Sequence, residues 1–219
     1  MRTPSFVIPV CLCISLAVFA GAPAFAANAI MPVTKAAKLM PLIPGNQAEF
    51  NQGAAAFDAG DYDTAYKIFS KLAEDEDLGA MRNVALMQRK GLGTKKDPKA
   101  ALRLYEYVAR AGLPTAQADL AEMLLKGEAG PPDPKAALPW LYLASAASHP
   151  MAQFYLGQLF EQGEVVPKDM MRAKLLYAAA AAHGEKRALA RLSYLYGWAA
   201  PPLDEAAKAQ VEGAKAASP

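Results

Sequence analysis

An alanine recurs at intervals of 36 residues along most of this chain of 219 residues, and glycine and aspartate keep the same interval. Three residue types that share one period without an insertion indicate a repeat protein. A period of this length is typical of a solenoid of helix pairs, in which each unit buries its apolar face against its neighbours. The residues in register are Ala80, Ala116, Ala152 and Ala188, then Gly91, Gly127 and Gly163, then Asp61, Asp97, Asp133 and Asp169.

Each period contains the start and stop signals of two helices. The glycines suit the left-handed conformation that ends a first helix. The aspartates suit the N-cap of a second helix, and Asp97 and Asp133 are followed by proline, which is favoured at the first helical position. The pattern therefore predicts first helices that begin at the alanines. It predicts second helices over residues 100–109, 136–147 and 173–182.

The two ends of the repeat region depart from this pattern. Asn46 and Glu49 form a capping box that predicts the first helix of an earlier unit. Residues 27–45 contain three prolines and little helical periodicity, which indicates a linker or N-terminal arm. A fifth unit starts at Ala188 and continues into a polar helix over residues 203–211. We predict a repeat domain over residues 46–214 and a flexible tail over 215–219.

Residues 1–26 have the pattern of a secretory signal peptide. Arg2 precedes an apolar stretch, and Ala24-Phe25-Ala26 resembles a cleavage site. Cleavage would remove both cysteines, Cys11 and Cys13, although lipidation of Cys11 is an alternative. Export predicts a periplasmic protein, with secretion as the alternative. No later apolar stretch reaches the roughly 20 residues of a membrane span, so none is expected in the mature chain.

The repeats resemble the Sel1-like repeat family. The resemblance is clearest in "ADLAEMLLKGEAGPPDPKAALPWLYLASAA" and "AQFYLGQLFEQGEVVPKDMMRAKLLYAAAAAHG", and it covers about residues 80–200. The earlier segment "AAFDAGDYDTAYKIFSKLAE" looks like a tetratricopeptide repeat. The resemblance implies an all-α fold, a right-handed solenoid of antiparallel helix pairs. It also implies an adaptor or scaffold that binds other proteins.

A stripe along the first helices is the candidate binding surface. Three positions of each first helix lie off the apolar face of the helical wheel, and their residue types change from unit to unit. By analogy with tetratricopeptide arrays, this stripe would line the concave face and contact a protein or peptide partner. An ordinary solvated surface is the alternative. The candidate partner-binding residues are Asn83, Asp119, Glu122, Tyr155, Gln158, Arg191 and Tyr194.

Aromatic residues refine this prediction. An exposed tyrosine offers a large contact area with a polar tip and is enriched at binding hot spots. Tyr155 and Tyr194 are therefore expected to be exposed and to anchor the partner. Trp140 and Phe154 are expected to be packing residues instead.

The sequence contains no motif typical of a catalytic, metal-binding or phosphate-binding site. His149 and His183 have no second histidine or carboxylate at metal-ligand spacing, and both fit the end of a helix, where the dipole favours a cation. No nucleophile elbow, phosphate loop or HExxH motif occurs. The loss of Arg2 leaves 22 basic residues beside 21 acidic ones, without a basic cluster for nucleic acid. We expect no catalytic residue, metal, cofactor or nucleic-acid partner.

The sequence thus predicts a non-catalytic periplasmic scaffold or adaptor. Two alternatives stay open at this point. One is a secreted effector that engages a host protein. The other is an envelope hydrolase or a protein that binds the cell wall, which for a hydrolase would require a nucleophile and a base converging in the groove.

Overall fold

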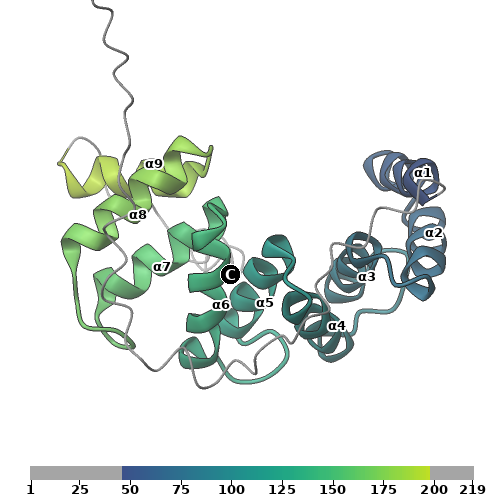
Figure 1. Cartoon of the computed structure of the whole chain (residues 1–219), viewed down its shortest axis with the longest axis horizontal. Coiled ribbons are helices and arrows are strands. Elements are labelled where there is room, and N and C mark those ends of the chain that lie inside the picture. Colours follow the sequence, from purple (N-terminus) through teal and green to yellow (C-terminus); the bar gives the residue numbers. More distant parts are fainter. Residues whose placement is uncertain (1–45, 198–219) are drawn as a thin grey trace, which may run out of the picture. The chain divides into compact units, whose positions relative to one another are not determined.

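The computed structural model describes residues 46–197, which form helices and no strand (Figure 1). Each helix contacts the next one along the chain, so successive helices pair and the pairs stack. This arrangement confirms the predicted all-α solenoid of helix pairs. The helices are α1 (Asn46–Asp58), α2 (Tyr62–Glu74), α3 (Leu78–Lys90), α4 (Pro98–Arg110), α5 (Pro114–Lys126), α6 (Pro134–Ala146), α7 (Pro150–Gln162), α8 (Met170–Ala182) and α9 (Lys186–Leu195).

We call α1, α3, α5, α7 and α9 the first helices and α2, α4, α6 and α8 the second helices. Several predicted segments lie outside the described residues: the signal peptide at 1–26, the arm at 27–45, the polar helix at 203–211 and the tail at 215–219. Each helix between residues 46 and 197 falls short of the length and apolar character that a membrane span requires.

The predicted caps form as hydrogen bonds and backbone conformations. Asp97, Asp133 and Asp169 each accept a hydrogen bond, 2.9 Å long, from the backbone N–H three residues later. Gly91 and Gly127 end α3 and α5 in the left-handed region, with φ of 76° and 66°. The first helices begin two residues before the alanines, because an N-cap aspartate in α3 and prolines in α5 and α7 start them earlier.

Small residues of the first helices pack against large residues of the second helices. Ala80, Ala116, Ala152 and Ala188 are fully buried, as are Tyr105, Leu141 and Tyr177 on the second helices. Phe154 is buried, and Trp140 packs against the cores of two neighbouring units. The structure therefore confirms that Phe154 and Trp140 are packing residues.

Candidate partner-binding surface

Polar side chains of the first helices bind one another across the units. Arg82 on α3 donates from Nε to Oδ2 of Asp119 on α5, at 2.7 Å. Arg191 on α9 donates from Nε to Oε2 of Glu161 on α7, at 3.0 Å. The partners are 37 and 30 residues apart in sequence, close to one repeat period. The first helices are therefore joined by side chains as well as by their apolar cores.

One set of these contacts runs through four successive first helices, and we call it the polar chain: Arg89, Glu122, Tyr155, Arg187 and Glu185. Arg89 on α3 donates to Glu122 Oε2 on α5 at 2.8 Å, and the Tyr155 hydroxyl on α7 donates to Glu122 Oε1 at 2.8 Å. Arg187 on α9 donates to the same hydroxyl at 3.1 Å and to Glu185 at 2.8 Å. The polar chain thus connects α3, α5, α7 and α9.

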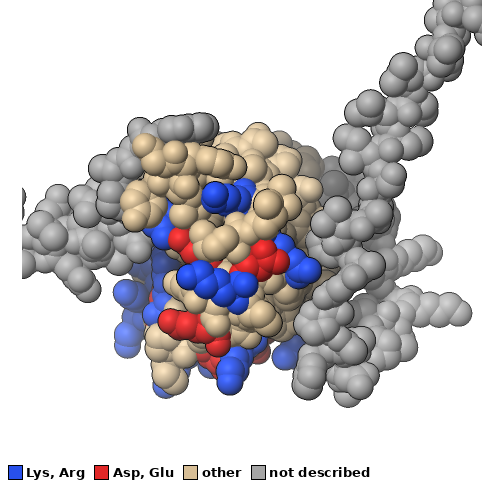
Figure 2. Space-filling model, turned by 90° about the vertical axis from the view of Figure 1, so that its left-hand side faces the viewer, with Lys and Arg blue, Asp and Glu red and all other residues tan. Residues whose placement is uncertain are grey.

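Further hydrogen bonds and a cation–π contact hold the residues of the polar chain in place. Glu128 accepts from Arg89 Nε at 2.6 Å, and Lys126 donates to Glu122 at 3.0 Å. The guanidinium of Arg187 lies 4.7 Å from the centre of the Phe154 ring, a cation–π contact. Acidic and basic side chains lie side by side on the end of the molecule that contains α8 and α9 (Figure 2).

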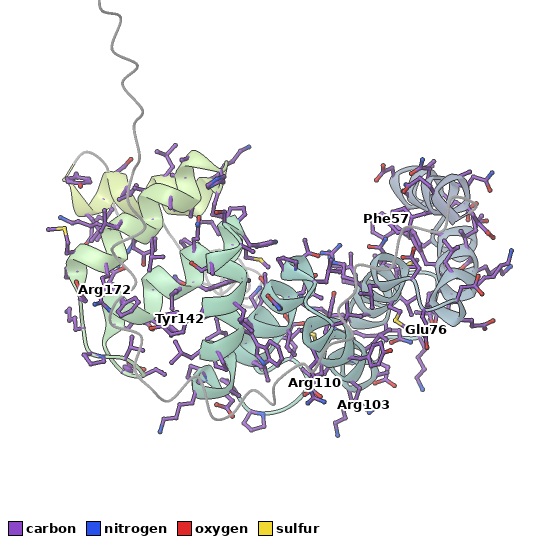
Figure 3. The ribbon with its side chains drawn as sticks, in the orientation of Figure 1. Phe57, Glu76, Arg103, Arg110, Tyr142 and Arg172 are labelled. Carbon is purple, nitrogen blue, oxygen red and sulfur yellow. The ribbon has the colours of Figure 1, made fainter. Side chains whose placement is uncertain are left out.

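On α4 and α8 the charges pair differently. Arg110 on α4 lies 3.9 Å from Glu106 of the same helix, and Arg172 on α8 lies 3.1 Å from Asp169, its own N-cap. Arg103 and Arg110 extend from α4, and Arg172 extends from α8 (Figure 3). Exposed pairs within one helix contribute little to stability. The first helices therefore differ from the second helices in having partly buried pairs that cross between units.

Burial and hydrogen bonding set the charge states of the polar chain. Burial acts to raise the pKa of Glu122, but hydrogen bonds from Lys126, Tyr155 and Arg89 outweigh it and lower the pKa from 4.5 to about 2. Burial, together with the charge of Glu122, raises the pKa of Tyr155. Glu122 is therefore ionised and Tyr155 is neutral at physiological pH, and the Tyr155 hydroxyl keeps its proton for Glu122.

The structure places all the predicted binding residues on first helices, but it corrects the expected exposure of Tyr155. Tyr155 is only 8% exposed, because its ring packs on Phe154 and its hydroxyl is held by Glu122 and Arg187. Asp119 is also buried. Tyr194 is 39% exposed beneath the guanidinium of Arg191. The prediction that Tyr155 is an exposed anchor is wrong, and a binding role for the other residues stays a prediction.

The remaining predicted residues divide into two groups. Asn83 accepts a hydrogen bond of 3.4 Å from Arg82, and Arg191 is held by Glu161. Gln158 is half-buried and lines a cavity between α5 and α7. The structure therefore joins most of the predicted stripe into contacts within the protein and leaves Gln158 and Tyr194 more available.

Sequence reasoning missed most of the partners that bind this stripe: Arg82, Arg89, Glu128, Glu161, Glu185 and Arg187. A signal for them was present, because opposite charges recur at separations of 30–39 residues. Separations near one period bring side chains of neighbouring first helices together. A search for charge complementarity at that spacing would have found Arg82 with Asp119 and Arg89 with Glu122.

A cavity of about 330 Å³ opens between the C-terminal halves of α5 and α7 and the loops that follow them. Leu125 and Leu159 line its apolar part, with Val165, with Pro132 from the loop before α6 and with Pro134 at the start of α6. Lys126, Gln158, Gln162 and Glu164 supply polar groups, and Tyr155 also contributes to its wall. A small cavity with apolar walls and a few polar groups is typical of a ligand site.

The histidines occupy different helix ends. His183 is the C-cap of α8, and its Nδ1 lies 2.8 Å from the carbonyl oxygen of Ala179. His149 lies just beyond the end of α6, where its backbone N–H donates to the carbonyl oxygen of Ala144 at 3.0 Å, and it is also the N-cap residue of α7. Burial lowers the pKa of His149, which favours a neutral ring. Among residues 46–197, no three His, Cys, Asp or Glu side chains gather in a way that could hold a metal ion.

Comparison with known proteins supports the repeat assignment. The profile of the Sel1 repeat family matches residues 79–113, 114–149, 150–185 and 186–209. No curated protein matched the chain.

Solved structures with a similar fold include a Sel1 repeat protein from Oxalobacter formigenes. It is 32% identical with a TM-score of 0.62, over 67% of this chain and 60% of that protein. A protective antigen of uropathogenic Escherichia coli strains, which displays an SLR fold, is 25% identical with a TM-score of 0.63, over 69% of this chain and 33% of the antigen.

An immunity protein from Pseudomonas aeruginosa is 27% identical with a TM-score of 0.54, over 71% of this chain and 60% of that protein. The match therefore spans less than two thirds of the length of each of these proteins.

Proposed function

Because the chain belongs to the Sel1 repeat family, we propose that it is a non-catalytic scaffold of the bacterial envelope that binds a protein or peptide along its first helices. Sel1 repeats are generally protein-interaction modules. The apolar stretch and cleavage pattern within residues 1–26 support export to the periplasm. The partner's binding site would include the exposed side chains that the polar chain leaves available.

The observation that carries this proposal is the polar chain itself. It fixes the spacing of α3, α5, α7 and α9 through partly buried hydrogen bonds. A surface whose spacing is fixed before binding loses less conformational entropy when a partner docks. The exposed residues beside the polar chain are therefore held in a constant arrangement, as a binding surface requires. They include Lys90, Gln162 and Tyr194.

Replacement of Tyr194 by Ala is expected to weaken partner binding at least tenfold, because a tyrosine anchor at an interface typically contributes more than 1.4 kcal/mol. Photo-crosslinking groups placed at Gln162 and at Tyr194 in cells that express the full chain would identify the partner. Titration of the purified partner would then measure the affinity. The matched control is Tyr107→Ala on α4, where Tyr107 is 51% exposed on a second helix.

Three results would contradict the proposal. Equal crosslinking of the partner from a photo-crosslinking group placed at Tyr107 would move the binding site to the second helices. Tyr107→Ala could weaken binding as strongly as Tyr194→Ala. If no position gives a crosslinked protein, the scaffold function is contradicted. Recovery of the chain from the culture medium instead of the periplasmic fraction would favour secretion.

A further inference from the structure

The cavity between α5 and α7 has polar side chains that no protein group satisfies. Gln158 and Gln162 lie one helical turn apart on α7, so their amides share one face of the helix. Glu164 follows α7 in the loop. Within residues 46–197, these three side chains make no hydrogen bond or ion pair with another residue. Two carboxamides and a carboxylate are therefore free to bind a ligand that enters the cavity.

The cavity also carries one charge of each sign, and the two charges come from different units. Lys126 ends α5, whereas Glu164 follows α7. Lys126 donates one hydrogen bond to Glu122 at 3.0 Å. An ammonium group has three donors, so two remain for a ligand. Glu122, which is itself held by Arg89 and Tyr155, therefore binds Lys126 where Lys126 lines the cavity.

The other walls are apolar. Leu125 and Leu159 line the cavity from the two first helices, Val165 and Pro132 line it from the loops, and Pro134 lines it from the start of α6. The volume of about 330 Å³ is at the lower end of the range of ligand sites. A ligand of this size that has an aliphatic side chain, a peptide group, an ammonium and a carboxylate would be complementary to the apolar, carboxamide and charged groups that line the cavity.

We propose that this cavity binds a free dipeptide with an aliphatic side chain. Lys126 binds the carboxylate, Glu164 binds the ammonium, and Gln158 and Gln162 bind the peptide group. The aliphatic side chain packs between Leu125 and Leu159. This activity goes beyond the proposed scaffold function, because the ligand is a small molecule with two charged ends. An internal segment of a protein has neither end.

The test uses four ligands that differ in charge. Ala-Leu carries both charges, N-acetyl-Ala-Leu lacks the ammonium, Ala-Leu amide lacks the carboxylate, and the doubly blocked peptide lacks both. Each is titrated at millimolar concentration into the full chain while the side-chain amide signals of Gln158 and Gln162 are followed by NMR. We expect Ala-Leu to shift both signals, and each blocked end to weaken binding about tenfold.

Two substitutions identify which residue binds which end. Lys126→Gln is expected to weaken Ala-Leu binding about tenfold and to leave the affinity for Ala-Leu amide unchanged. Glu164→Gln is expected to weaken Ala-Leu binding and to leave the affinity for N-acetyl-Ala-Leu unchanged. The matched control is Lys90→Gln, because Lys90 is the residue one period before Lys126 and does not line the cavity.

Three outcomes would overturn the proposal. In the first, Ala-Leu does not shift the two amide signals. In the second, the doubly blocked peptide binds as tightly as Ala-Leu. In the third, Lys126→Gln weakens the binding of Ala-Leu amide, or Glu164→Gln weakens the binding of N-acetyl-Ala-Leu, as much as it weakens the binding of Ala-Leu. Circular dichroism of each variant excludes unfolding as the cause. Partner capture through Tyr194 is measured separately, so a failure of the dipeptide proposal leaves the scaffold proposal standing.

Discussion

Replacement of Glu122 by Gln is expected to lower the free energy of unfolding by about 3 kcal/mol at pH 7 and by almost nothing near pH 2. The pKa of Glu122 falls from 4.5 to about 2 on folding, and a difference of one pKa unit corresponds to about 1.4 kcal/mol. Gln keeps the shape of the side chain and resembles the protonated form. The variant should therefore behave at pH 7 as the wild type behaves when Glu122 is protonated.

The direction of the pH effect follows from the sign of the shift. A carboxyl group whose pKa is lowered by folding stabilises the protein above its unfolded pKa. That contribution is lost as the pH falls from about 4.5 to about 2. The pKa values of Glu161 and Glu185 are lowered as well, by hydrogen bonds to Arg191 and Arg187 that in Glu161 overcome the effect of burial. The wild type should therefore lose stability steeply in acid, and the variant less steeply.

Urea unfolding at pH 7, 5, 4, 3 and 2, followed by circular dichroism, measures both effects. Urea is preferred to guanidinium because it does not screen ion pairs. The matched control is Glu106→Gln, since Glu106 is paired on the surface of α4 with Arg110 at 3.9 Å. The control is expected to change the free energy of unfolding by less than about 0.5 kcal/mol. A difference between Glu122→Gln and wild type that does not shrink below pH 4 would contradict the assignment.

Replacement of Gly93 by Ala is expected to destabilise the protein by about 3 kcal/mol. Gly93 lies in the loop between α3 and α4 with a φ of 60°, which costs a residue with a side chain roughly 1–2 kcal/mol. A Cβ at this position would lie 2.1 Å from the carbonyl oxygen of Tyr62, at the start of α2. That neighbour is backbone, so it yields less readily than a side chain, and overpacking adds roughly 1–3 kcal/mol.

The matched control for Gly93 is Gly112→Ala. Gly112 also has a positive φ, of 96°, but a Cβ there would meet nothing within 4 Å. The control should therefore show the backbone cost alone, about 1 kcal/mol. Thermal and urea unfolding of the two variants would separate the contributions. Equal destabilisation would show that the close approach to Tyr62 has no energetic effect.

Gly93 also distinguishes the start of the array from its later units. The residues one and two periods after it are Ala129 and Val165, which have side chains and pack against apolar cores. The glycine is needed where the loop meets α2, the second helix of the unit that looks like a tetratricopeptide repeat. Substitution is therefore expected to loosen the junction of α2 with α3 before it affects α7 and α8.

The sequence by itself determined the helix pairs, their order and their caps. These features depend on residues within one or two turns of each other. Asp97 binds an N–H three residues away, and Gly91 adopts a left-handed conformation at the end of its own helix. The 36-residue register then identified the buried alanines, because every unit must present the same small side chain to its neighbours.

Only the tertiary structure decided which polar side chains remain available for a partner. Tyr155 has the spacing of an exposed residue, yet Glu122 and Arg187 from the neighbouring units hold its hydroxyl and bury it. Such contacts depend on the rotation between units and on the reach of each side chain, which helical periodicity within one unit does not encode. The same reason explains Gly93. A glycine is required there because the backbone of α2, which is distant in the sequence, lies close to it in space.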